Sequence, residues 1–156
     1  MPDYQITTLR TIGHQLEVES KSKLIEEITN LLNERFEHKV DRGRRVSETV
    51  EAALEQNGRT SLLLAVQDMK VVGILTVTFV PDFDYDFAHW RNLVVNKEYE
   101  GNGVARALLD SARMMGKQRG MEMACLAIDH DAPEHVRKFY RGLGFEADAS
   151  EAHHLY

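Results

Sequence analysis

The sequence predicts an α/β (α+β) fold in one domain, with a mixed, mostly antiparallel sheet flanked by helices. The chain has 156 residues, of which 43% are apolar, and this is enough to build the core of a single domain. Segments with apolar residues at helical spacing alternate with runs of β-branched and aliphatic residues. No repeat, low-complexity tract or proline-rich linker divides the chain, so we expect one domain over residues 1–156.

The N-terminal part predicts one strand and two helices. A short strand is expected at residues 5–9. Apolar residues then recur at helical spacing, at Leu24, Ile25, Ile28, Leu31, Leu32 and Phe36. A second helix is expected from about Ser47, a suitable N-cap, to the Asn57-Gly58 pair, which is typical of a helix end.

Strand-forming segments follow in the middle of the chain. The runs SLLLAV and VVGILTVTFV are separated by the polar QDMK, which predicts an antiparallel hairpin. The next strand is expected at HWRNLVV, from His89 to Val95. These segments predict the centre of the sheet.

The C-terminal part predicts two more helices and the remaining strands. Val104, Leu108, Ala112 and Met115 indicate a helix that ends near Gly120. MEMACLAI, from Met121 to Ile128, predicts a buried strand. Pro133 suits the first turn of a last helix that carries residues 135–143, and the chain then turns at Gly144 into a short strand pair.

Charge and cysteine content restrict the class of protein. The formal net charge is −6 and the pI is about 5.6, which disfavours nucleic acid and anionic membranes as partners and favours a cationic one. The single cysteine, Cys125, cannot form an internal disulfide and is expected to be a packed strand residue. The first ten residues lack the layout of a signal peptide, so we expect the cytoplasm. The most apolar window is interrupted by Gln67, Asp68 and Lys70, which argues against a membrane span.

The stretch YEGNGVARALLD, from Tyr99 to Asp110, predicts a glycine loop at the start of a helix. Such a loop can bind an anion through unpaired backbone N–H groups. A dinucleotide fingerprint would require a glycine where Arg106 stands, and the Gly-Lys-Ser/Thr of a P-loop is absent. A site for another diphosphate, such as coenzyme A, and a turn that merely connects strand to helix both remain open at this point.

Two motifs together resemble the GNAT superfamily of N-acetyltransferases. VNKEYEGNGVA, from Val95 to Ala105, is similar to the family's cofactor loop, Arg/Gln-x-x-Gly-x-Gly/Ala, except that Glu100 stands at the Arg/Gln position. FYRGLGF, from Phe139 to Phe145, is similar to the ending of the family's late helix. The resemblance covers roughly residues 62–145, and the expected order of elements matches a GNAT-like fold.

The resemblance implies that acetyl-CoA binds to the backbone. Its pyrophosphate would meet the N–H groups of residues 101–105, and its pantetheine arm would follow the strand at residues 93–95. The expected cofactor-binding residues are Leu93, Val94, Val95, Glu100, Gly101, Asn102, Gly103, Val104, Ala105 and Arg106.

The resemblance also indicates catalytic residues. Tyr140 lies at the position of the family's tyrosine that protonates the leaving thiolate, and a phenol can donate such a proton. Many members have a glutamate base where Arg91 stands here, so that role does not carry over. His89 shares a strand face with Arg91 and is the expected proton acceptor, with His153 or His154 as alternatives. The two adjacent histidines do not form a recognisable metal site, and no metal is expected.

Two charged clusters point to opposite kinds of acceptor. Asp82, Asp84 and Asp86 alternate with aromatic residues and are expected to bind a cationic amine. Arg42, Arg44 and Arg45, placed between the first two helices, either hold an acceptor carboxylate or face water.

The sequence therefore predicts an acetyl-CoA-dependent N-acetyltransferase that acts on a primary amine by direct transfer. A small cationic amine, such as a polyamine or aminoglycoside, is favoured over a protein lysine or N-terminus. A GNAT-shaped acyl-CoA sensor without catalysis is the alternative from another class. The sequence does not decide between a monomer and a homodimer.

Overall fold

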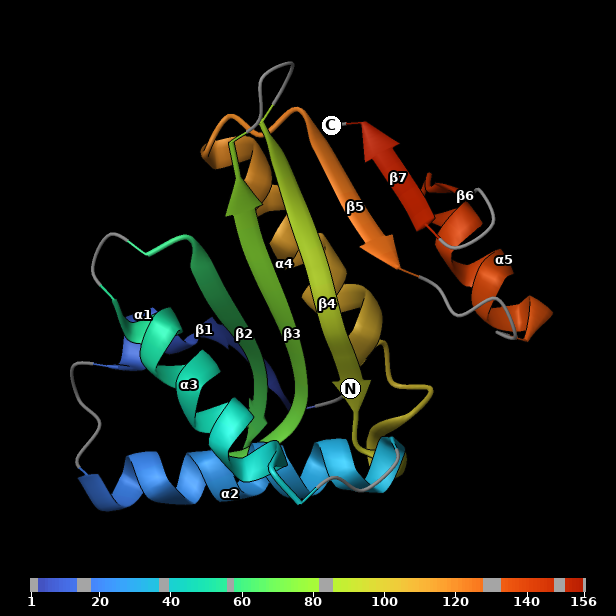
Figure 1. The fold of residues 1–156 in the computed structure, drawn as a ribbon. Helices are drawn as coiled ribbons and strands as arrows, with labels where there is room; N and C mark the ends of the chain where they lie inside the picture. The colour runs from blue at the N-terminus through green and yellow to red at the C-terminus, as the bar shows by residue number, and fades with distance from the viewer. Residues whose placement is uncertain are drawn as a thin grey trace.

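The computed structural model describes residues 3–13, 18–36, 40–55, 58–81, 86–127, 133–147 and 151–155, and within them a seven-stranded sheet forms the centre (Figure 1). In spatial order its strands are β1 (Gln5–Thr8), β2 (Thr60–Gln67), β3 (Lys70–Val80), β4 (Phe87–Val95), β5 (Met123–Ala127), β7 (Glu151–Leu155) and β6 (Glu146–Ala147). Neighbouring strands are antiparallel except for β4 and β5, which are parallel. The predicted mixed, mostly antiparallel sheet is confirmed.

Helices cover both faces of this sheet (Figure 1). They are α1 (Leu9–Gly13), α2 (Val18–Arg35), α3 (Arg42–Leu54), α4 (Val104–Gln118) and α5 (Glu134–Gly142), with a 3₁₀ turn, η1 (Lys97–Tyr99), before α4. The core on the α4 face contains Leu75, Trp90 and Leu108, and the core on the α2 and α3 face contains Ile28 and Val50. The sheet is therefore buried on both sides, which explains why β2 and β3 are almost continuously apolar.

The predicted start of the second helix at Ser47 is wrong. Helix α3 begins at Arg42, with Asp41 at the N-cap position, and Ser47 lies inside the helix. The carboxylate of Asp41 contacts Arg44 and Arg45, three and four residues further on, and such pairs support a first turn without an N-cap side-chain bond. The arginines predicted between two helices therefore belong to α3 itself.

Other boundaries differ in smaller ways. A five-residue helix, α1, follows β1 directly and was not predicted; Leu9, expected as the end of the strand, is fully buried within it. Helix α3 ends at Leu54, before the predicted stop, of which Asn57 lies outside the described residues. Pro133 occupies the N-cap position of α5 rather than its first turn.

The predicted hairpin of β2 and β3 is confirmed. Gln67 and Lys70 pair, and the two residues between them, Asp68 and Met69, have φ values of 50° and 65°. Positive φ at both central residues is the geometry of a tight hairpin turn that matches the twist of the strands.

Gly73 in β3 allows helix α4 to pack closely on the sheet. A Cβ atom at this position would lie 2.9 Å from Cγ1 of Val104 and 3.2 Å from Cδ1 of Leu108. Val104 is the first residue of α4, so the absence of a side chain at Gly73 determines how near the start of α4 lies to the sheet.

Strands β4 and β5 separate halfway along β4. Their pairing runs from Phe87 opposite Met123 to Trp90 opposite Leu126, whereas β4 continues to Val95. In Figure 1 the ends of the two strands diverge, with the end of β4 near the start of α4. The second half of β4 thus has an edge that no described strand covers.

A β-bulge lies where this separation begins. Thr76 of β3 pairs with Arg91, but Ile74 pairs with Val94, so β4 has one extra residue over this interval. Asn92, within it, has a φ of 58°, a conformation that asparagine tolerates better than most residues. The bulge changes which residues of β4 face each side of the sheet.

Candidate active site

The free edge of β4 forms one wall of a groove of about 580 Å³. The residues that line it are Arg35, Phe36, Leu93, Val94, Val95, Tyr99, Glu100, Gly101, Gly103, Val104, Ala105, Arg106, His135, Val136, Phe139 and Tyr140. They come from the end of α2, the second half of β4, the glycine loop, the start of α4 and helix α5. Segments far apart in the sequence therefore meet at the point where β4 and β5 separate.

The glycine loop at the end of β4 is held in a specific backbone shape. Asn96 Oδ1 accepts a hydrogen bond of 2.9 Å from the N–H of Glu98, which supports the 3₁₀ turn. Gly101 and Gly103 have φ values of 79° and 78°, a region that favours glycine. Tyr4 donates from its hydroxyl to the carbonyl oxygen of Asn102 at 3.3 Å, which connects the loop to the N-terminal segment.

The first turn of α4 has the backbone geometry that favours an anion. Gly103 is its N-cap and makes no side-chain capping bond, and the first helical hydrogen bond runs from the N–H of Ala107 to the carbonyl of Gly103. The N–H groups of the preceding residues have no partner within the helix. Together with the helix dipole they favour an anion such as a phosphate at this end of the groove.

Glu100 stands at the mouth of this anion site, but its charge is paired. Nη1 of Arg35, the last residue of α2, lies 2.7 Å from Oε1 of Glu100. Both side chains line the groove, and Arg106 lines it as well. Two of these three side chains, Arg35 and Arg106, are positive and one, Glu100, is negative. Their summed charge is therefore positive, which is the sign that a phosphate requires.

Tyr140 lies on the α5 side of the groove in an aromatic cluster. Its ring packs edge-to-face on Phe139 and Phe145, with ring centroids 5.2 Å and 6.0 Å apart. Burial raises the pKa of the Tyr140 phenol above its ordinary value of 10.0. The hydroxyl is therefore protonated at neutral pH and can act as a proton donor.

The backbone of β4 presents hydrogen-bonding groups to the groove. The N–H of Asn96, directly after β4, donates to Val72 O on the β3 side at 2.8 Å. Since consecutive residues of a strand direct their backbone groups to opposite edges, Val95 directs its own away from β3, and so does Leu93. These groups face the edge that β5 leaves uncovered.

A second cavity of about 260 Å³ lies on the other side of the β4 bulge. Its lining residues are Ile28, Leu32, Phe36, Arg42, Arg45, Val46, Thr49, Val50, Leu62, Ile74, Thr76 and Asn92. Phe36, whose side chain is half exposed, lines both cavities. On β4, Asn92 lines the second cavity while the next residue, Leu93, lines the first, so the bulge contributes a residue to each cavity.

Some expected site residues lie elsewhere. Asn102 does not line the groove, and its side chain donates to the carbonyl of Tyr99 at 3.3 Å. His89 is half-buried in β4 between Thr78 and Cys125, and it lines neither cavity.

The described residues support no role for the remaining candidates. Asp86 is exposed just before β4 and lines neither cavity, while Asp82 and Asp84 lie outside the described residues. His153 and His154 lie on β7, which β5 separates from β4. The predicted roles of these residues stay predictions.

Six groove residues have no counterpart among the predicted site residues. They are Arg35 and Phe36 at the end of α2, Tyr99 in η1, and His135, Val136 and Phe139 in α5. Phe36 was predicted as the last apolar position of an amphipathic helix. It lies over sixty residues before the glycine loop, so the sequence did not indicate that the two would line the same groove. Arg35 carried no signal, because a charged residue at a helix end is ordinary.

The described residues contain neither a cluster for a metal ion nor a membrane-spanning helix. Among them, no group of three or more His, Cys, Asp or Glu side chains is arranged to hold a metal ion. Within the same part of the chain, no helix has both the length and the apolar character that crossing a bilayer requires.

The fold and the groove define an α/β domain in which a glycine loop and the start of a helix lie beside a split sheet. The sequence matches the model of the acetyltransferase (GNAT) family over residues 25–145. The chain therefore belongs to the GNAT acetyltransferase family, as the two motifs predicted. A search of curated protein sequences finds no match.

Solved structures share the whole fold at low sequence identity. The PaiA N-acetyltransferase of Thermoplasma acidophilum, in complex with coenzyme A, is 16% identical with a TM-score of 0.71, covering 97% of this chain and 99% of that one. The ribosomal-protein-alanine N-acetyltransferase of Brucella melitensis is 20% identical with a TM-score of 0.68, covering 93% of each chain. An aminoglycoside 6'-N-acetyltransferase complexed with coenzyme A is 16% identical with a TM-score of 0.69, covering 85% of this chain and 91% of that one. These likenesses show the fold.

Proposed function

We propose that this protein transfers an acetyl group from acetyl-CoA to a primary amine of a small molecule by direct attack. The observation that carries the proposal is the single groove that combines the start of α4, the free edge of β4 and Tyr140. Membership of the acetyltransferase family supports the reaction class, and the solved complexes with coenzyme A support the donor.

The chemistry of the groove suits coenzyme A. The loop at Gly101 and Gly103 lets a diphosphate approach the backbone, and the start of α4 supplies N–H donors. Arg106 and Arg35 add positive charge at this end. Leu93 and Val95 offer backbone donors and acceptors that suit the amide groups of a pantetheine arm.

Each catalytic demand has a candidate group in the chain. When bound, acetyl-CoA would supply a thioester whose carbonyl carbon is attacked by the amine. A backbone N–H of the segment 93–95 is proposed to donate to the carbonyl oxygen as negative charge develops on it. Tyr140 is proposed to protonate the leaving sulfur, a role that its raised pKa suits because the phenol is protonated at neutral pH.

The attacking amine must lose a proton, and His89 is proposed to accept it. Arg91 stands exposed on β4, with Nη2 3.3 Å from Oγ1 of Thr78, and a guanidinium cannot accept a proton. His89 precedes it by two residues on the same strand face and is proposed to act through water. Substitution of His89 by alanine should then lower kcat at neutral pH more than at acidic pH, because only a neutral imidazole can accept a proton.

The expected small cationic acceptor has little support from the described residues. Of the three aspartates proposed to bind it, only Asp86 is described, and it lines neither cavity.

The test is release of free thiol from acetyl-CoA over a panel of amines that includes small amines and peptides with a free lysine or N-terminus. Acetylated product from a small amine, identified by mass spectrometry, is the expected result. Saturable coenzyme A binding with no acetyl transfer to any amine would indicate a binding module instead. Turnover confined to peptides would place the acceptor among proteins.

A further inference from the structure

The second cavity differs from the cofactor groove in the charge of its lining. Among the described residues that line it, none is acidic and two, Arg42 and Arg45, are basic. The rest of the wall is apolar apart from three neutral polar residues, Thr49, Thr76 and Asn92. Because none of the described lining residues is acidic, the positive charges of a polyamine would have no carboxylate partner in this wall. Their removal from water would also cost free energy.

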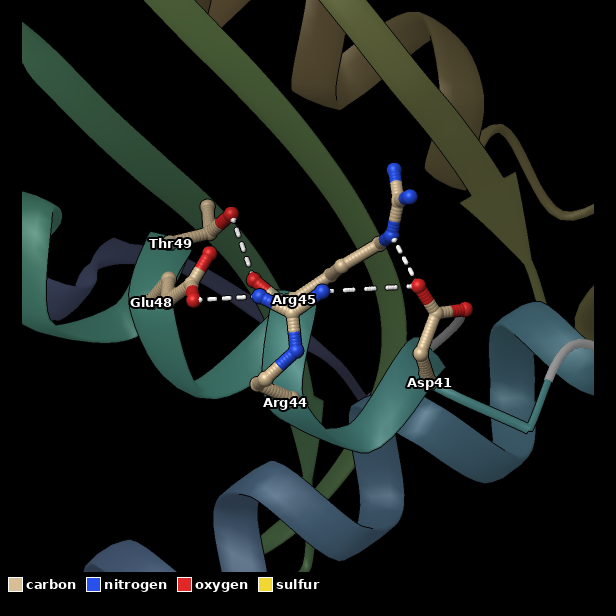
Figure 2. Close-up of polar contacts among 5 residues, drawn as sticks. All are labelled: Asp41, Arg44, Arg45, Glu48 and Thr49. Atoms are coloured by element: carbon tan, nitrogen blue, oxygen red, sulfur yellow. Dashed lines mark hydrogen bonds and ion pairs between the residues drawn. The ribbon is translucent and has the colours of Figure 1, made fainter.

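Arg45 is held at the cavity by the acid before the helix. Its Nε donates to Oδ2 of Asp41 at 2.7 Å, and this hydrogen bond lowers the pKa of the Asp41 carboxyl below its ordinary value. In Figure 2 the two terminal nitrogens of Arg45 point away from Asp41. The bond therefore fixes the side chain through one of its five N–H donors and directs the planar end of the guanidinium elsewhere.

Arg44 precedes Arg45 and contacts the same carboxylate, Asp41, but it does not line the second cavity. Its guanidinium lies between Asp41 and Glu48, with Nη1 2.7 Å from Oε1 of Glu48 (Figure 2). Arg44 and Arg45 thus contact the same carboxylate, and of these two only Arg45 lines the cavity.

The strand side of the cavity adjoins the proposed reaction centre. Thr76 Oγ1 lies 3.5 Å from Nδ2 of Asn92, and Asn92 precedes Leu93, which lines the cofactor groove. Phe36 forms part of both walls. An amine bound beside Asn92 and Phe36 would therefore lie next to the cofactor groove, while the arginines are on α3.

From this polarity we infer that the second cavity binds the acceptor, and that the acceptor is a small amine with a compact apolar body and a carboxylate. The inference rests on the proposed function and specifies its substrate class. Arg45 binds the carboxylate, with Arg42 beside it, and the amine points toward Asn92 and the groove. The volume of about 260 Å³ lies below the roughly 300–1,000 Å³ of pockets for drug-sized ligands, so the body is small.

The experiment compares acceptors that share a body and differ in charge. One set is leucine, leucinamide and isopentylamine, and a second set is aminohexanoate, its amide and hexylamine, with acetyl-CoA turnover followed by thiol release. In at least one set the carboxylate is expected to raise kcat/KM by roughly tenfold to a hundredfold over the amide, because a charge-assisted hydrogen bond is stronger than a neutral one. No carboxylate preference in either set, with turnover of other amines, would overturn this inference and leave the proposed function intact.

A pair of variants then assigns the preference to Arg45. Arg45→Gln should raise KM for the carboxylate acceptor by about tenfold or more, and should leave KM for the matched amide and for acetyl-CoA unchanged. Arg44→Gln should leave all of these constants within about twofold of wild type. Equal losses in both variants would reduce the effect to general surface charge and overturn the role of Arg45. Absence of thiol release with every amine would instead refute the proposed function, and this inference with it.

Discussion

Arg35 and Glu100 form an ion pair of 2.7 Å, between Nη1 and Oε1, that joins the end of α2 to the glycine loop. The pair explains how a carboxylate can open a loop that is built to bind phosphate. Glu100 stands where the family motif has Arg or Gln, and a cation is supplied from a different part of the chain. The pair is partly exposed, with 32% and 52% of the two side chains accessible, so its effect is weakened by solvent and salt.

This pair makes a prediction for Glu100→Gln. Removing the carboxylate leaves Arg35 in the groove without its counter-charge, so coenzyme A binding should tighten by roughly fivefold at most at low salt, which is about 1 kcal/mol. The gain should fade at high ionic strength. Calorimetric titrations at two salt concentrations measure it, with Arg35→Gln expected to weaken binding in the same salt-dependent way. Loss of binding in Glu100→Gln would show that the carboxylate shapes the loop.

The left-handed backbone at Gly103 makes a second prediction. Valine at this position is strained by the φ of 78°, so the loop would lose the backbone shape that presents the N–H groups at the start of α4 to a phosphate. Coenzyme A affinity of Gly103→Val should fall severely while the domain stays folded by circular dichroism. Gly43→Ala is the control, because Gly43 is helical with no atom within 4 Å of the added Cβ position. Unchanged affinity in Gly103→Val would place the cofactor elsewhere.

Tyr140→Phe should separate chemistry from binding. The change removes one hydroxyl and keeps the ring contacts with Phe139 and Phe145, so kcat should fall by on the order of a hundredfold with little change in coenzyme A affinity. Tyr99→Phe is a matched control, since Tyr99 lines the same groove near the loop. If wild-type kcat persists in Tyr140→Phe at every pH, the tyrosine is structural.

The raised pKa of Tyr140 also predicts a pH dependence of stability. The folded state holds the phenolic proton more tightly than the unfolded state, so the stabilising contribution is complete below the unfolded pKa of about 10 and is lost as the pH rises from there through the folded pKa. The free energy of unfolding should therefore decline above about pH 10 more steeply in wild type than in Tyr140→Phe. Urea denaturation over this range measures the difference, and identical slopes would contradict the raised pKa.

Local patterns in the sequence were sufficient for most of the fold. The spacing of apolar residues predicted α2 and α4, Pro133 predicted the region of α5, and runs of β-branched and aliphatic residues predicted β2 and β3, because these signals depend on neighbours a few residues apart. The glycines at 101 and 103 and the FYRGLGF motif predicted the family, which the family model confirms. The start of α3 was mispredicted, since Ser47 has the chemistry of an N-cap whether or not the helix begins there.

Contacts between distant segments required the folded chain. The β4 bulge at Asn92, the pairing of Arg35 with Glu100 and the orientation of Arg45 toward a cavity each depend on elements that meet only after folding. The residue type determines the charge of a side chain, but the strength of its interactions depends on the partners and the solvent around it. An anion site at the start of α4 could be predicted from residues in one stretch. The charge of the second cavity's lining could not, because that lining combines residues of α2, α3, β2, β3 and β4.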